Sequence, residues 1–161
     1  MRHSIALKQS EFTHTAVIRD RVRPEELPRF VPAACGEVWN FIRSAQLPRP
    51  GRHVALYLDD EGSVEVGAEV SAPFTGNERV HCSRLPVGTV AAATHFGPYA
   101  GLGKAHAAIR AWCAEHGHRR TGISWEIYGH WEQRWNNDPS KISTEVFHLL
   151  TTANLKANSI A

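Results

Sequence analysis

Acidic and phenolic side chains alternate with apolar ones late in this sequence. Glu126, Tyr128 and His130 are spaced two residues apart, and Trp125, Ile127 and Gly129 alternate with them. In a β-strand, side chains two residues apart lie on the same face of the sheet. If Trp125 and Ile127 pack on helices, Glu126 and Tyr128 face a cleft on the other side. A solvated strand face is the alternative, because glutamate is usually exposed.

A second carboxylate lies in the next predicted strand, where Glu145 is in phase with Phe147. Two carboxylates that approach each other in an apolar cleft raise the pKa of one of them and supply an acid and a base. Hydrolysis of a bound compound would need that pairing. A solvated position at the rim of the cleft is the other interpretation of Glu145.

Aromatic residues on predicted strands, or at a strand-to-helix junction, are the candidates for the wall of the cleft. An aromatic wall with one carboxylate can hold a flat organic cation, through the faces of the rings and the opposite charge. The same residues in a core would give the same sequence pattern. The candidates are Tyr57, Phe96, Tyr99, Tyr128 and Phe147.

Other chemistries find little support. The chain has ten histidines, but the closest pair, His116 and His118, precedes Arg119 and Arg120, whose charges disfavour a bound cation, and no third ligand follows at a regular spacing. We therefore expect no metal and no cofactor. Serine, histidine and aspartate occur without a G-x-S-x-G nucleophile turn.

Charge and cysteine content narrow the class of protein further. Lys and Arg number 18 against 16 Asp and Glu, a net charge of +2, and the basic clusters lack interleaved aromatics or a helix-turn-helix. We expect no direct binding of nucleic acid. Three cysteines without a CxxC spacing suggest reduced thiols. With no signal-peptide pattern and no apolar run of about 18 residues, we expect a soluble cytoplasmic protein without a membrane segment.

The elements that must position the candidate residues occur twice. Each unit has a β-rich stretch, an apolar stripe at helical spacing and two further β-like runs that form a hairpin. Trp39 aligns with Trp112 on the two helical stripes, where we expect both in the core, and Tyr57 aligns with Tyr128. The expected elements are 15–22, 27–42, 53–58 and 64–70, then 89–96, 102–116, 123–131 and 144–151.

This order predicts an α+β fold of duplicated βαββ units in a pseudo-two-fold arrangement, with the helices on one face and a central ligand cleft on the other. A chain of 161 residues has room for one domain. We place that domain at residues 12–151 and treat 1–11 and 152–161 as terminal extensions.

An ordered set of short motifs resembles the GyrI-like small-molecule-binding family, the effector domain of AraC-type and multidrug-sensing regulators and of single-domain proteins. The resemblance covers about residues 12–151. It implies a cleft between two βαββ halves that takes apolar or cationic aromatic compounds, with Glu126 of an E-x-Y motif inside. The motifs are VEVG at 64–67, LPVGTV at 85–90, HFGPY at 95–99, WEIYG at 125–129, DP at 138–139 and TEV at 144–146.

The resemblance implies a stand-alone protein that binds apolar, aromatic and cationic small molecules in drug or toxin sensing or sequestration, with any regulatory effect passing through a protein partner. The alternative is a hydrolase that opens the cyclopropane ring of DNA-alkylating natural products. In that case Glu126 is the expected base, Tyr128 or Tyr99 the hydrogen-bond donor, and Glu145 the residue that holds the water.

Overall fold

The computed structural model describes residues 3–151 of the chain, and its helices and strands follow the expected order. Short 3₁₀ turns precede both helices and fill the connection between the last two strands. The elements are β1 (Ala6–Gln9), β2 (Thr13–Arg21), η1 (Pro24–Glu26), α1 (Leu27–Ser44), β3 (His53–Tyr57), β4 (Ser63–Val70), β5 (Val80–Leu85), β6 (Thr89–Phe96), η2 (Tyr99–Gly101), α2 (Leu102–Glu115), β7 (Arg120–Tyr128), η3 (Gln133–Asn136), η4 (Pro139–Lys141) and β8 (Ser143–Leu150).

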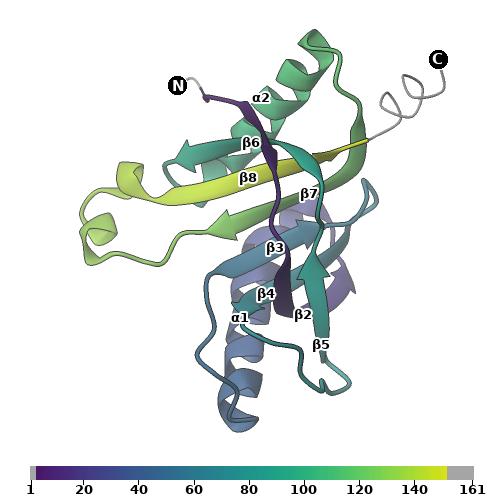
Figure 1. Cartoon of the computed structure of the whole chain (residues 1–161). Helices are drawn as coiled ribbons and strands as arrows, with labels where there is room; N and C mark the ends of the chain where they lie inside the picture. The colour runs from purple at the N-terminus through teal and green to yellow at the C-terminus, as the bar shows by residue number, and fades with distance from the viewer. Residues whose placement is uncertain (1–2, 152–161) are drawn as a thin grey trace, which may run out of the picture.

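All eight strands form one antiparallel sheet in the order β1-β6-β8-β7-β3-β4-β2-β5 (Figure 1). The unit β2-α1-β3-β4 occupies one half and β6-α2-β7-β8 the other, with the equivalent strands in mirrored order about the centre. There β3 and β7 pair directly, with Leu56 opposite Trp125. The predicted α+β fold of two βαββ units is confirmed.

The two outer positions of the sheet are filled by strands outside the repeated units. β5 pairs with β2 at one edge, and β1 pairs with β6 at the other, with Ala6 opposite Ala92. The expected N-terminal extension therefore contributes a sheet strand. All four residues of β1 are exposed, so no alternation of apolar side chains marks it in the sequence. The expected C-terminal extension, 152–161, lies outside the described residues.

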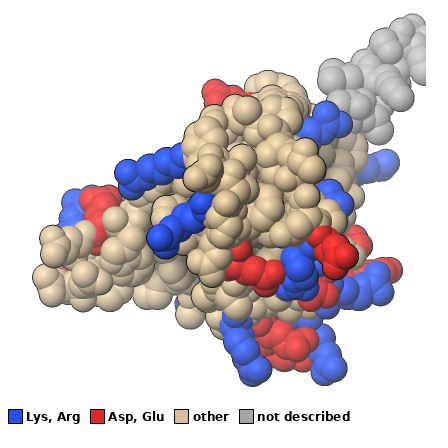
Figure 2. All heavy atoms as spheres, turned by 90° about the horizontal axis from the view of Figure 1, so that it is seen from below, with Lys and Arg blue, Asp and Glu red and all other residues tan. Residues whose placement is uncertain are grey.

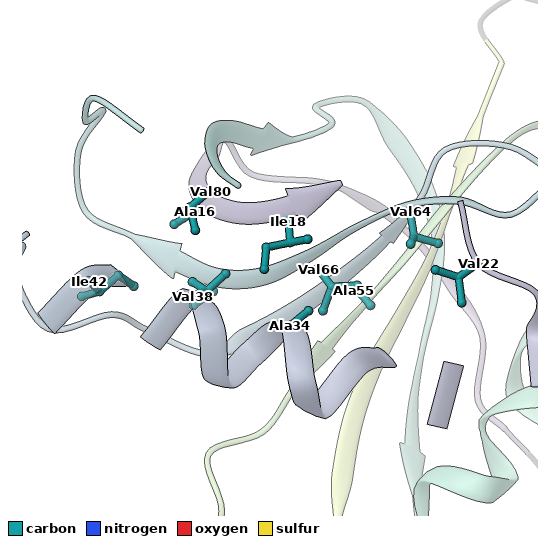
Figure 3. Packing of buried hydrophobic residues seen from close by; sticks show 11 residues of the cluster. Ala16, Ile18, Val22, Ala34, Val38, Ile42, Ala55, Val64, Val66 and Val80 are labelled. Atoms are coloured by element: carbon teal, nitrogen blue, oxygen red, sulfur yellow. The ribbon is translucent and has the colours of Figure 1, made fainter. Parts of the chain in front are cut away.

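Helix α1 packs on the first half of the sheet through side chains one turn apart. Ala34, Val38 and Ile42 recur every four residues and are buried. Figure 3 shows them against side chains of β2 and β4, including Ile18 and Val66. The spacing places all three on one face of the helix. This packing fixes α1 over β2 and β4.

Helix α2 covers the second half in the same way. Ala105, Ile109 and Cys113 are buried and also recur every four residues. They pack with Ala91 of β6 and Val146 of β8. Each half thus has one helix (Figure 1), and that helix packs on a core of its own.

A third apolar cluster lies on the face of the sheet that the helices do not cover. Trp125 and Ile127 of β7 pack there with Val54 and Leu56 of β3. The supposition from the sequence that Trp125 and Ile127 pack on the helices is wrong. Since alternate residues of a strand face opposite sides, Glu126 and Tyr128 point to the helix side. The cleft lies on the same face as the helices, between them, and the prediction that placed it on the opposite face is corrected.

The surface carries charges of both signs. On the face drawn in Figure 2, Lys and Arg side chains are interspersed with Asp and Glu, as expected for a chain with a net charge of +2. Within residues 3–151, no helix has the length and apolar character to cross a membrane.

Candidate functional site

A cavity of about 1250 Å³ opens between α1 and α2, above the central strands β3 and β7. It lies at the seam of the two halves, where neither helix covers the sheet. Residues from both helices form its walls, and side chains from the central strands form its floor. The wall includes Val31, Cys35 and Trp39 of α1 and Gly103, His106 and Arg110 of α2, and the floor Tyr57, Ser124, Glu126 and Tyr128.

Glu126 lies on the floor of this cavity and is only 4% exposed. Its Oε1 accepts hydrogen bonds from the hydroxyls of Tyr57 at 3.0 Å and Tyr128 at 2.5 Å. Its Oε2 lies 2.7 Å from Nε2 of His106. A carboxylate only accepts hydrogen bonds, and three donors converge on this one. The buried charge is therefore compensated from β3, β7 and α2.

The two phenols keep their protons at neutral pH. Burial, and then the charge of Glu126, raise the pKa of Tyr57 and of Tyr128 well above the ordinary value. Both hydroxyls therefore act as donors to the carboxylate. Tyr99 lines the same cavity and stacks edge-on against Tyr128, with ring centroids 5.5 Å apart.

His106 connects Glu126 to a second buried histidine. Its Nδ1 lies 2.9 Å from Nε2 of His148, a β8 side chain that is 3% exposed. Burial, followed by the neighbouring His106, lowers the pKa of His148 to about 3, so His148 is neutral at physiological pH. A neutral His148 can donate from Nε2 to Nδ1 of His106, which leaves the Nε2 proton of His106 for Glu126.

The structure brings together four of the residues predicted for the site. Tyr57, Tyr99, Glu126 and Tyr128 line the cavity from both halves of the chain. Their part in ligand binding remains a prediction. The alternation along β7 placed Glu126 and Tyr128 on a common face, and the duplication paired Tyr57 with Tyr128.

Glu145 lies on the far face of the sheet, which corrects its expected approach to Glu126. In the register of β7 and β8, Glu126 pairs with Val146 and Glu145 with Ile127. Residues directly opposite each other share a face, so Glu145 lies on the side away from the helices. Its carboxylate is 3.4 Å from the guanidinium of Arg52.

Phe147 and Phe96 also lie away from the cavity, which corrects their expected place in its wall. Phe147 is in phase with Glu145 and stacks on Trp125, with ring centroids 5.3 Å apart. Phe96 ends β6 in phase with Ala92, a member of the far-face cluster, and is 54% exposed. These positions depend on which face of each strand is turned toward the helices. The alternation in the sequence separates the two faces but does not show which of them the helices cover.

Three further residues belong to the site and were not predicted there. His106 and His148 form the hydrogen-bonded pair, and Trp39, expected in the core, lines the cavity and is 40% exposed. His148 lies on the same buried face of β8 as the apolar Val146 and Leu150. A histidine on an apolar strand face was therefore the available signal for a buried polar partner, but nothing in the sequence names that partner.

Trp112 does not correspond to Trp39 in the two units, which corrects their alignment. The buried helix faces match Ala34 with Ala105 and Val38 with Ile109, so Trp39 corresponds to Arg110, and both line the cavity. Trp112 itself lies half-buried on α2. It stacks on His116 and His118, with ring centroids 4.4 and 5.3 Å away. In the described part of the chain, no three His, Cys, Asp or Glu side chains are grouped to hold a metal ion.

A comparison with protein families agrees with this architecture. The chain belongs to the GyrI-like small molecule binding domain family, whose model matches residues 4–148. It is accordingly a small-molecule-binding domain. No match was found among curated proteins.

Solved structures share the fold at low sequence identity. The C-terminal domain of EcmrR is 20% identical with a TM-score of 0.76, over 94% of this chain and 99% of that one. SAV2435 bound to tetraphenylphosphonium is 10% identical with a TM-score of 0.63, over 94% of each chain. A hydrolase from Listeria innocua is 13% identical with a TM-score of 0.57, over 91% of each. These likenesses concern the fold.

Proposed function

We propose that the chain binds flat or bulky organic cations in the cavity between α1 and α2, as a sensor or sequestering protein for drugs or toxins. The observation that carries this proposal is the buried carboxylate of Glu126 at the floor of an aromatic-lined cavity.

The size and walls of the cavity suit an apolar molecule of drug-like dimensions. Its volume of about 1250 Å³ exceeds the range of about 300–1,000 Å³ that is common for ligand pockets, so the cavity has room for such a molecule. Tyr57, Tyr99, Tyr128 and Trp39 present aromatic surface to it. Aromatic rings attract cations through their faces, by up to about 2 kcal/mol when water is excluded.

The charge at the floor favours a positive ligand over a neutral one. Oε2 of Glu126 accepts one hydrogen bond in the described structure, from His106, whereas Oε1 accepts two. In a water-poor cavity, attraction between opposite charges is much stronger than at the protein surface. The fold neighbour SAV2435 was solved with tetraphenylphosphonium, an organic cation with four phenyl rings. That ligand supports the proposal by analogy of fold.

The test is a titration of the fluorescent cation N-methylacridinium with the wild-type protein and with Glu126→Gln. We expect the variant to bind at least about tenfold more weakly, a loss of about 1.4 kcal/mol, because the amide has no charge. Glu145→Gln is the matched control, since Glu145 lies on the far face with Arg52. Equal affinity in all three proteins would contradict the proposal.

Hydrolysis of a strained ring is the second candidate function. The hydrogen bonds that connect Glu126 to His106 and His106 to His148 favour it. A base at Glu126 would take a proton from water as the water oxygen bonds to a cyclopropane carbon. The ring C–C bond breaks, and its electron pair moves to a conjugated carbonyl oxygen of the substrate. His106 and His148 give the proton a path away from the carboxylate.

The same geometry places this candidate second. Both Tyr57 and Tyr128 already donate to Glu126, and Glu145 cannot hold the water from the far face. Tyr99 is the cavity phenol without a bond to Glu126. Incubation with a cyclopropane-bearing DNA alkylator, followed by mass spectrometry, tests for addition of one water. Intact substrate in the presence of excess protein would exclude this candidate.

A further inference from the structure

We propose that His106 determines the charge preference of the cavity, because it competes with cationic ligands for Glu126. On this account, binding of an organic cation expels one proton from the His106–His148 pair, whereas binding of an uncharged ligand does not. The inference rests on the proposed cation binding and specifies how it is regulated.

The geometry gives His106 two hydrogen-bond partners of different kinds. Nε2 points to a carboxylate oxygen of Glu126 at 2.7 Å, and Nδ1 to Nε2 of His148 at 2.9 Å. Side-chain exposure at the ion pair is 13% for His106 and 5% for Glu126. The pair is thus shielded from bulk water, and it lies in the wall and floor of the cavity.

Both protonation states of His106 keep these two hydrogen bonds. The neutral ring donates from Nε2 to Glu126 and accepts at Nδ1 from His148. The imidazolium donates from both nitrogens, and neutral His148 then carries its proton on Nδ1 and accepts at Nε2. His148 serves in either role because burial keeps a second proton off it. The proton on His106 can therefore be gained or lost without breaking the chain.

A charged His106 opposes a bound cation. The imidazolium and Glu126 form a buried pair with no net charge, which removes the attraction for a positive ligand. A cation that enters near the carboxylate would also be repelled by the imidazolium, and such repulsion is strong where water is excluded. The cation therefore prefers the neutral form of His106. An uncharged ligand has no such preference.

The other ionisable groups around the pair come from four elements. From β3, the ring of Tyr57 lies edge-on to His106 at 6.0 Å. From α1, Cys35 lines the cavity as a neutral thiol, since burial raises its pKa to about 12. The cations Arg110 of α2 and Arg120 of β7 help to lower the pKa of His148.

Tyr128 of β7, whose raised pKa keeps it protonated, and the histidines His53 and His130 also line the cavity. The other ionisable residues of its lining are Arg49, Asp59, Asp60 and Tyr99. Burial, followed by the nearby His130, lowers the pKa of His53. Neither His53 nor His130 has a hydrogen bond to Glu126 within the described structure. His53 is therefore the matched control for His106.

Proton release can be measured on the unaltered protein. Calorimetric titration with N-methylacridinium, a cation whose charge does not change with pH, is run at pH 6.5 in PIPES and in bis-tris. These buffers differ in their heat of ionisation, so a released proton gives a buffer-dependent binding heat. We expect release of a measurable fraction of one proton. Equal heats in both buffers, with binding intact, would overturn the inference and leave the proposed function standing.

Variants identify the residue that releases the proton when the cation binds. Measured at several pH values from 5 to 8, the association constant of wild type should rise with pH, by up to about tenfold per pH unit, because one proton is linked to binding. His106→Gln should flatten this rise, whereas His53→Gln should retain it. The uncharged isostere 9-methylanthracene should bind wild type with no such rise. A wild-type slope in His106→Gln, or the same slope for both ligands, would overturn the inference. Absence of any N-methylacridinium binding would contradict the proposed function itself.

Discussion

At the scale of single residues, the site is a carboxylate whose hydrogen bonds come from three elements. Glu126 accepts from Tyr57, Tyr128 and His106, and His106 is backed by His148. The spacing of Glu126 and Tyr128 along one strand made their shared face predictable. The histidines could not be predicted, because each occurs singly in its own element. They meet only in the folded chain, where α2 brings His106 beside Glu126 of β7 and His148 of β8.

The buried His148 should make stability depend on pH. Its pKa is about 3 in the folded protein, against about 6.5 in an unfolded chain. Between these values the unfolded state binds more protons, so the contribution of His148 is fully present above pH 6.5 and is lost as pH falls toward 3. We expect a slope of up to about 1.4 kcal/mol per pH unit from this group.

Urea unfolding of wild type and His148→Gln at several pH values between 4 and 7 measures that contribution. The free energy of unfolding should fall less steeply with acidification in the variant, because glutamine does not take up a proton. Parallel curves for the two proteins would show that His148 is not held neutral by the fold.

At the scale of elements, helix spacing and strand alternation predicted the two units. Which side chains line the cavity depends on which face of each strand is turned toward the helices. The every-fourth-residue spacing of Ala34, Val38 and Ile42 is visible in the sequence. The register that pairs Glu126 with Val146 is not, and one residue of register exchanges the faces of a strand. For this reason the sequence pattern left two positions open for Glu145, in the cleft beside Glu126 or at a solvated rim.

The end of α2 gives a prediction at this scale. Gly117 follows the helix with φ of 72°, and the N–H of His118 bonds to the carbonyl of Cys113, as in a Schellman motif. Gly117→Ala should destabilise the protein by about 1 kcal/mol, because a Cβ disfavours this conformation. Gly36 is the matched control, since it lies exposed in α1 and a Cβ there meets no atom within 4 Å.

Gly36→Ala should instead stabilise the protein by about 0.5–1 kcal/mol, through the higher helix propensity of alanine. Urea unfolding of wild type and the two variants measures the sign of each change in the free energy of unfolding. A stabilising Gly117→Ala would mean that α2 does not end as the structure has it.

At the scale of the whole molecule, duplication explains why the cavity lies at the centre. Each half covers its outer strands with its own helix, and the central pair β3 and β7 is left open between α1 and α2. The repeat was predictable from the repeated order of strand and helix patterns and from the alignment of Tyr57 with Tyr128, whereas the alignment of Trp39 with Trp112 was wrong by two residues. The side of the sheet on which the cleft opens was not, because Trp125 and Ile127 pack with the far-face cluster, and an apolar face alone does not say which layer covers it.

The most direct test of the account compares N-methylacridinium with its uncharged isostere 9-methylanthracene, in wild type and in Glu126→Gln at pH 8. Fluorescence titration of each ligand with protein gives four dissociation constants. The account predicts that wild type prefers the cation, and that the substitution weakens cation binding by at least about tenfold while the anthracene binds as before. An equal loss for both ligands, or no loss for either, would contradict the claim that the charge of Glu126 selects the ligand.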